Sequence, residues 1–124
     1  MRPSRALIVG LAAAAAATAA FAQGNPVNGK AAFEAQCSGC HSVSGPSFAG
    51  PSLEGVYGRQ AGTAAGFQYS DAMKKSGVTW TNDSLNVFLA DPNKLVPGTI
   101  MPVNVPDPQQ RDDIVEYLRS LKGQ

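Results

Sequence analysis

Residues 37–41 read Cys37-Ser38-Gly39-Cys40-His41, and they contain both cysteines and the single histidine of the 124-residue chain. Random placement would scatter these three residues, so their grouping indicates one site that uses all of them. Two thiols three positions apart, at the end of a helix, can bond as thioethers to one edge of a porphyrin. The next residue, His41, then projects toward the metal at the porphyrin centre.

This spacing is the attachment signature of a c-type haem. It predicts one haem c, bound covalently through Cys37 and Cys40, with His41 as an iron ligand. Three other uses of the same residues are weaker. A thioredoxin-like dithiol needs βαβ units, and the chain has no parallel-strand pattern. A disulfide between the two cysteines would close too small a loop to stabilise much, and zinc would need a fourth ligand.

The first 22 residues have the features of a secretory signal peptide. Two arginines come first, an uncharged and mostly alanine run follows at 7–20, and Ala20-Phe21-Ala22 offers small residues for cleavage. A membrane anchor is disfavoured because the run is interrupted by a glycine and a threonine and is poor in leucine and isoleucine. We therefore expect cleavage near Ala22, location in the periplasm, and a single monohaem domain at 23–124 with no membrane span.

Composition limits the partners of this domain. The chain has 10 Lys+Arg against 9 Asp+Glu, and loss of the two N-terminal arginines leaves the acidic residues one ahead. The basic residues form no stripe, so the sequence does not predict nucleic-acid binding. About a hundred residues suffice for one domain with a modest core, in which a large bound group would matter for filling space.

Upstream of residue 80, the pattern indicates short helices and one long loop. Residues 29–36 are a helix-forming run that leads into the cysteine pair. Residues 44–66 are rich in glycine, proline and serine and predict a loop, which at this length is expected only where it serves a function such as wrapping a ligand. Residues 70–75 can form a short helix capped by Ser70 and ended by Gly77.

Downstream, a helix capped by Thr81 or Asn82 should stop at Asp91, because the next residue is a proline. Residues 96–106 contain three prolines and predict a second irregular stretch.

The last helix has the clearest signals. Asp107 is the expected N-cap, Pro108 the first helical residue, and Gln110 the partner in a capping-box variant. Apolar residues at helical spacing follow, at Ile114, Tyr117, Leu118 and Leu121. No stretch alternates with period two and no repeat occurs, so the sequence predicts an all-α fold with long loops.

The second iron ligand decides between carrying electrons and haem catalysis. With one histidine in the chain, the candidates are Met73, Met101, a lysine or an open position. Met101 lies in a proline-bounded loop, where a sulfur is a poor core filler and a sensible ligand, whereas Met73 on a short helix suits packing. A His/Met pair raises the reduction potential and leaves no open site for oxygen chemistry, which indicates a one-electron carrier.

Several motifs, in order and spacing, resemble those of the class I cytochromes c, in particular the bacterial cytochrome c2-like and mitochondrial-like branch. The resemblance covers essentially all of 23–124 and implies the cytochrome c fold. The motifs are Gly29 and Phe33 before Cys37-x-x-Cys40-His41, then Gly50-Pro51-x-Leu53-x-Gly55-x-x-Gly58-Arg59, Phe67-x-Tyr69-Ser70-Asp71-Ala72, Trp80, Pro97-Gly98-Thr99-x-Met101 and Tyr117-Leu118.

The resemblance also implies roles. The carbonyl of Pro51 would accept from the ring N–H of His41, and Thr99 would help to hold the loop that presents Met101. Gly29 and Phe33 of the first helix would meet Tyr117 and Leu118 where the first and last helices cross. The residues that would donate to the buried haem propionates are Arg59, Tyr69 and Trp80.

Two positions depart from many relatives: Phe88 replaces a tyrosine near the methionine sulfur, and Met73 replaces an asparagine near the haem. Both changes make the pocket less polar, so we expect a higher potential than the same fold with the polar pair. This chain has few basic residues on the face around the haem edge that is basic in the family, which weakens steering toward an acidic partner. These residues are Lys30, Lys74, Lys75 and Lys94.

Together these features predict a monomeric periplasmic electron carrier that is not an enzyme. Its partners would be redox proteins: a membrane cytochrome complex, an oxidase, a reaction centre or a periplasmic dehydrogenase. The alternative is a haem enzyme, peroxidase-like or a sulfur-compound oxidase subunit, with an exchangeable sixth ligand. A third possibility is an electron-entry subunit bound permanently in a larger complex.

Overall fold

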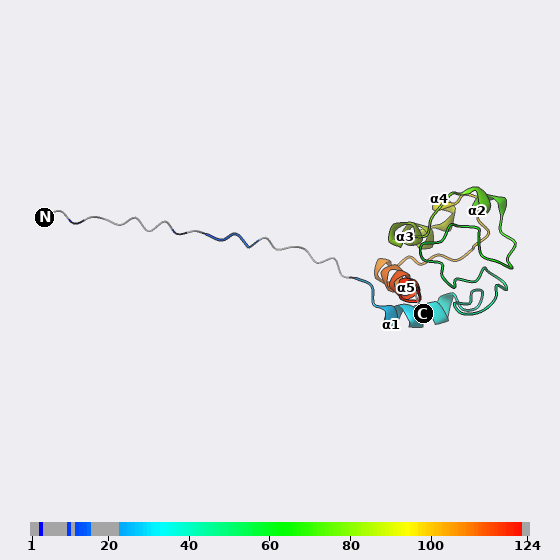
Figure 1. Ribbon diagram of the computed structural model, residues 1–124, viewed down its shortest axis with the longest axis horizontal. Helices are drawn as coiled ribbons and strands as arrows, with labels where there is room; N and C mark the ends of the chain where they lie inside the picture. Colours follow the sequence, from blue (N-terminus) through cyan, green and yellow to red (C-terminus); the bar gives the residue numbers. More distant parts are fainter. Residues whose placement is uncertain (1–2, 4–9, 11, 16–22, 123–124) are drawn as a thin grey trace.

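The computed structural model describes residues 23–122 together with residues 3, 10 and 12–15. The signal peptide expected at 1–22 lies almost entirely outside the described residues. In the described part of the chain the regular structure is helical, which confirms the all-α prediction, and β-pairing is limited to an isolated bridge between Gln60 and Thr79. The helices, shown in Figure 1, are α1 (Pro26–Gln36), α2 (Asp71–Lys75), α3 (Asn82–Ala90), α4 (Pro92–Leu95) and α5 (Pro108–Ser120).

Helix α1 begins at Pro26, three residues before the start that we predicted. The side chain of Asn25 accepts hydrogen bonds from the backbone N–H groups of Val27 and Asn28, at 2.9 and 3.3 Å, so it caps two free donors of the first turn. Pro26 fits the first helical position, where no N–H is needed. The pair Asn25-Pro26 marks the start of this helix, and a prediction from helix-forming composition alone does not detect it.

Of the two hydrogen-bonding partners predicted for the capping box of α5, Asp107 caps the helix as predicted, whereas the role predicted for Gln110 is wrong. The Asp107 carboxylate accepts from the backbone N–H groups of Gln109 and Gln110 at 2.8 and 3.2 Å, as an N-cap should. The Gln110 side chain does not return to the cap, because its Oε1 accepts from Nε2 of Gln36 at 2.8 Å and so ties α5 to α1. Helix α3 has the true capping box, between Thr81 and Ser84.

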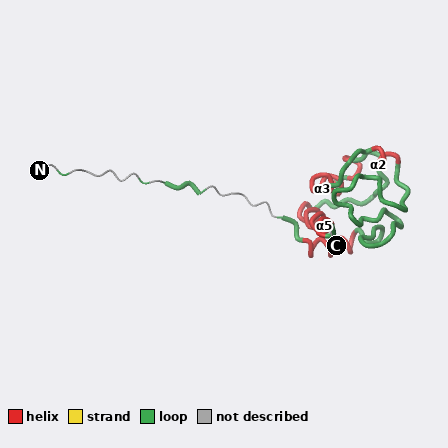
Figure 2. The backbone as a smooth tube through the Cα atoms, viewed as in Figure 1, coloured by secondary structure: helices red, strands yellow, loops and turns green. Residues whose placement is uncertain are grey.

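Helix α3 ends at Ala90 with Asp91 as its C-cap, as predicted, but the chain then turns at once into α4, which the sequence pattern did not predict. Pro92 explains both events, since proline stops the preceding helix and suits the first position of the next. The stretches 44–66 and 96–106 contain no helix, which confirms both predicted loops, and Figure 2 shows how much of the domain they form. No helix in the described ranges is long and apolar enough to cross a membrane.

Helix α5 is the centre of the packing, because it contacts both α1 and α3 (Figure 1). At the α1–α5 crossing, a Cβ on Gly29 would lie 1.9 Å from the backbone oxygen of Asp113 and 2.8 Å from Cβ of Tyr117. Only glycine permits this approach. One turn later, the rings of Phe33 and Tyr117 pack with their centroids 5.6 Å apart. The first and last helices thus meet where the resemblance implied.

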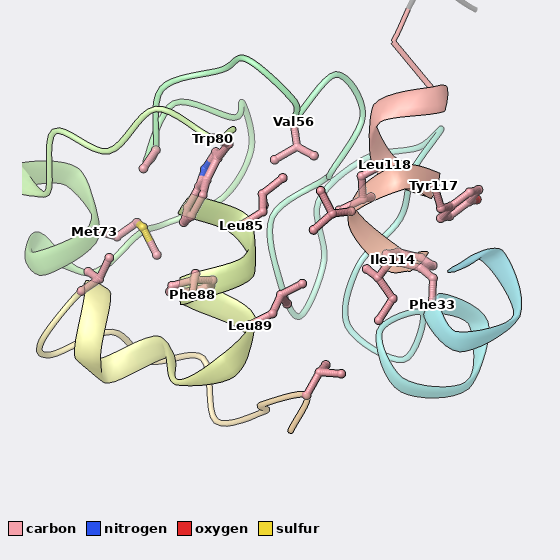
Figure 3. Packing of buried hydrophobic residues seen from close by; sticks show 14 residues of the cluster. Phe33, Val56, Met73, Trp80, Leu85, Phe88, Leu89, Ile114, Tyr117 and Leu118 are labelled. Atoms are coloured by element: carbon pink, nitrogen blue, oxygen red, sulfur yellow. The ribbon is translucent and has the colours of Figure 1, made fainter. Parts of the chain in front are cut away.

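The buried side chains form two groups with Leu85, Leu89 and Val56 between them (Figure 3). One group belongs to the α1–α5 crossing. The other contains Trp80 and Phe88, whose ring centroids are 5.0 Å apart, together with Met73. Members of both groups line a central cavity, so the core is built around it.

The α1–α5 crossing yields a stability prediction. Gly29→Ala should lower the free energy of unfolding by about 1 to 3 kcal/mol, because its methyl group must displace backbone of α5. Denaturant unfolding of the purified protein measures this. Gly45→Ala is the control, since a Cβ there would lie 3.7 Å from the nearest atoms. Equal shifts in the two variants would show that the crossing tolerates a side chain.

Candidate functional site

All the site residues predicted from the sequence line one cavity of about 200 Å³. Its wall is mostly apolar, with contributions from α1, α2, α3, α5 and both long loops. The predicted residues that it brings together are Cys37, Cys40, His41, Pro51, Arg59, Tyr69, Trp80, Thr99 and Met101.

The cysteine pair lies at the end of α1. The backbone N–H of Cys37 donates to the carbonyl of Phe33 at 2.8 Å and completes the last turn. The N–H groups of Cys40 and His41 both donate to the carbonyl of Cys37, at 3.1 and 2.9 Å. This tight turn brings all three side chains of the motif to the cavity wall. Neither thiol is in a disulfide.

Burial raises the pKa of the Cys37 thiol to about 11, with a smaller contribution from the neighbouring Cys40. The sulfur is therefore protonated and neutral at physiological pH. A thioredoxin-like dithiol needs βαβ units. The described residues form helices and no strand, which opposes the dithiol alternative.

The imidazole of His41 is held from the loop at 44–66. Its Nδ1 lies 2.7 Å from the carbonyl oxygen of Pro51, so the ring N–H donates there and Nε2 keeps a lone pair for a metal. Gly50 lies against the ring, where a Cβ would approach its Cε1 to 2.6 Å. Gly50 belongs to one of the sequence motifs, but its spacing in that motif predicts no role for it.

Met101 belongs to the other irregular stretch. Its backbone N–H donates to Oγ1 of Thr99 at 3.4 Å, and the N–H of Thr99 donates to the carbonyl of Val96 at 3.0 Å. The intervening turn uses Gly98 at a φ of +90°, a conformation that favours glycine. Met73, by contrast, is buried in α2, although it too lines the cavity.

The guanidinium of Arg59 is anchored at two of its three nitrogens. Nη1 donates to the carbonyl of Glu54 at 2.8 Å and Nη2 to that of Ser52 at 3.0 Å. Nε is buried and has no partner among the described residues. A buried donor on a permanently charged group needs an acceptor, and an anion satisfies both needs.

Tyr69 and Trp80 line the same cavity as this cation. The Tyr69 oxygen accepts the backbone N–H of Ala64 at 3.1 Å, which leaves its own proton for another acceptor. The backbone N–H of Trp80 donates to the carbonyl of Arg59 at 2.9 Å, so the two segments are fixed to each other.

Other lining residues received no site role from the sequence. Phe67 packs edge-on against Tyr69, with centroids 5.0 Å apart, and only its place in a quoted motif hinted at this. Ile100 and Val103 flank Met101 and are exposed as well as lining the cavity. No sequence signal marks an exposed apolar residue in a loop as part of a site.

The model of the family described as Cytochrome c matches residues 26–122. The chain belongs to this family. It is 48% identical to cytochrome c2 of Rhodopila globiformis, over 80% of this chain and 95% of that protein. It is 41% identical to cytochrome c2 of Rhodomicrobium vannielii over the full length of both. Among solved structures, cytochrome cH from Methylobacterium extorquens aligns with a TM-score of 0.74 and 44% identity, over 78% of this chain and 99% of that one.

The family is one of electron carriers, and membership implies one covalently bound haem c. The cavity residues fit that group. Two free thiols reach its wall beside an imidazole whose Nε2 is available, and an apolar lining suits a porphyrin. The unpartnered Nε of Arg59 matches the acidic propionates. The observed fold is the cytochrome c fold that the sequence predicted.

The arginine anchor gives a second prediction. Arg59→Met should lower the free energy of unfolding by about 2 to 4 kcal/mol, because two carbonyls lose charged hydrogen-bond donors. Denaturant unfolding of the haem-loaded protein measures the change. Arg119→Met is the matched control, since that guanidinium is exposed and pairs with Glu116 on one turn of α5. An equal loss of unfolding free energy in the control would show that Arg59 stabilises the protein no more than an exposed arginine does.

Proposed function

We propose that the protein is an exported one-electron carrier in which Cys37 and Cys40 hold haem c by thioethers and His41 and Met101 ligate its iron. One observation carries the proposal: the ring of His41 is fixed at 2.7 Å on a backbone carbonyl, with Nε2 free, in the same cavity wall as Met101. When bound, haem supplies a single electron by the change of its iron between the ferric and ferrous states.

The chain holds its two ligands by independent anchors. Pro51 fixes the orientation of His41 and, by accepting from Nδ1, makes Nε2 a stronger ligand. Thr99 ties the backbone of Met101 within a separate loop. Each ligand is thus oriented by its own segment before any metal–ligand bond forms.

Three polar side chains would satisfy the propionates. Arg59 offers its buried Nε and a permanent positive charge, and Tyr69 offers a hydroxyl proton that no described residue takes. Trp80, which is buried and lines the same cavity, would add its ring N–H. Charged hydrogen bonds of this kind offset the cost of burying carboxylates in an apolar pocket.

The remainder of the wall excludes water. Buried side chains such as Leu85, Phe88 and Leu89 line the cavity and offer no hydrogen bonds. With His41 and Met101 both holding the iron, no coordination site would remain open for peroxide or a sulfur compound. The arrangement therefore favours the carrier over the haem enzyme.

The location and partners are part of the same proposal. The features of residues 1–22 support export and cleavage after Ala22, which would leave Gln23 as the first residue of a periplasmic monomer. Asn25, the cap of α1, follows two residues later, so the described domain contains the whole of its first helix. The partners would be redox proteins that reach the haem edge.

The test of the proposal is a pair of methionine variants. Met101→Ala should abolish the weak near-infrared sulfur-to-iron band of the oxidised protein and lower the midpoint potential, because the thioether ligand is lost. Met73→Ala, the matched control from the same cavity, should keep the band. Retention of the band in Met101→Ala with its loss in Met73→Ala would assign the ligand to α2 instead.

The aromatic wall gives a prediction about the potential. Phe88 is buried against Trp80 and lines the cavity. Phe88→Tyr should lower the midpoint potential by an amount on the order of tens of millivolts, since a hydroxyl makes the haem surroundings more polar. Potentiometric titration measures it, with exposed Phe48→Tyr as the control. An unchanged or higher potential would contradict the role of pocket polarity.

A further inference from the structure

The opening of the cavity is formed by residues that both line it and are exposed. None of them is charged. These residues, here called the rim, are Gln36, Cys40, Ala49, Ile100, Pro102 and Val103.

The rim carries large apolar side chains, and their exposure to water is energetically unfavourable. Ile100 is 66% exposed and Val103 is 38% exposed, on either side of Met101. Phe48, which is 54% exposed, directly precedes Ala49 of the rim. Single exposed apolar residues are ordinary, but their concentration at the mouth of a redox site is typical of a surface that another protein covers.

The lysines of the chain do not compensate for this apolar surface. None of the five lines the cavity. Lys30 pairs with Glu34 at 3.9 Å, Lys74 pairs with Asp71 at 3.3 Å, and the amine of Lys122 lies 6.0 Å from the centroid of the Tyr57 ring. Lys75 and Lys94 are exposed, and they too lie outside the lining of the cavity. Arg59 is the one permanently charged residue in the wall, and two of its nitrogens donate to backbone carbonyls.

We propose that the rim is a docking surface for a redox protein whose own docking face is apolar and nearly uncharged. This inference rests on the proposed carrier function, because it names the class of partner that reaches the haem edge. A strongly acidic partner face would find no cation on the rim to pair with and would lose hydration against Ile100 and Val103. An apolar face loses no such hydration and gains from the burial of both side chains.

The charge of the rim sets how salt affects the encounter. Steered association between opposite charges falls by 10-fold or more as salt rises, whereas contact between uncharged faces does not. Electron exchange with the natural partner should therefore change by less than about twofold between about 10 mM and about 150 mM salt, where the Debye length falls from about 30 Å to about 8 Å.

The experiment uses the haem-loaded protein with the membrane and periplasmic fractions of the organism that produces it. Rates of reduction and oxidation are followed optically against protein concentration and salt. Ile100→Thr and Val103→Thr should each raise KM by about three- to tenfold. Val27→Thr and Val87→Thr are the matched controls, since these valines are 75% and 42% exposed on α1 and α3 and do not line the cavity. They should leave KM unchanged.

The outcomes separate the two proposals. If rates fall steeply with salt and the Ile100 and Val103 variants match their controls, the carrier function stands and the apolar docking surface is overturned. If neither fraction exchanges electrons with the protein at any salt concentration, the carrier function itself fails, and the docking surface with it. A retained near-infrared band in each rim variant shows that a raised KM reflects docking and not loss of the Met101 ligand.

Discussion

The central cavity is the constraint on which the rest of this fold depends. A domain of about a hundred residues has little core, and here buried side chains from both groups line one cavity. Filling this space with close contacts removes a mostly apolar wall from water and so stabilises the domain. Haem c is therefore a structural part of the core as well as the redox centre of the family.

The anchors of His41 and Arg59 come from one short piece of backbone. The carbonyl of Pro51 holds His41, and the carbonyls of Ser52 and Glu54 hold Arg59. His41, the proposed iron ligand, and the guanidinium of Arg59 are thus oriented by the same four residues of a loop. This explains how a fold with so little regular structure can have a precisely oriented site: backbone carbonyls of the loop do what side chains on a rigid helix would otherwise do.

The sequence was most informative where chemistry depends on spacing and least where it depends on distant contacts. The cysteine–histidine motif, the loops and α5 follow from local patterns, and all the predicted site residues share one cavity. The start of α1 and the presence of α4 were missed because single capping and proline residues outweighed composition. Gln110 was misassigned because its partner, Gln36, is 74 residues away. No local rule could have placed Gly50 against the ring of His41.

The crossing of α1 and α5 has a consequence for how the protein matures. It joins the first helix of the domain to the last, so this contact cannot form until nearly the whole chain has emerged from the machinery that delivers it. Closing so long a loop is also slow relative to local turn formation. The cysteine pair lies at the end of α1, within the part of the chain that emerges first. Its thiols can therefore meet haem before the C-terminal helix docks and closes the domain.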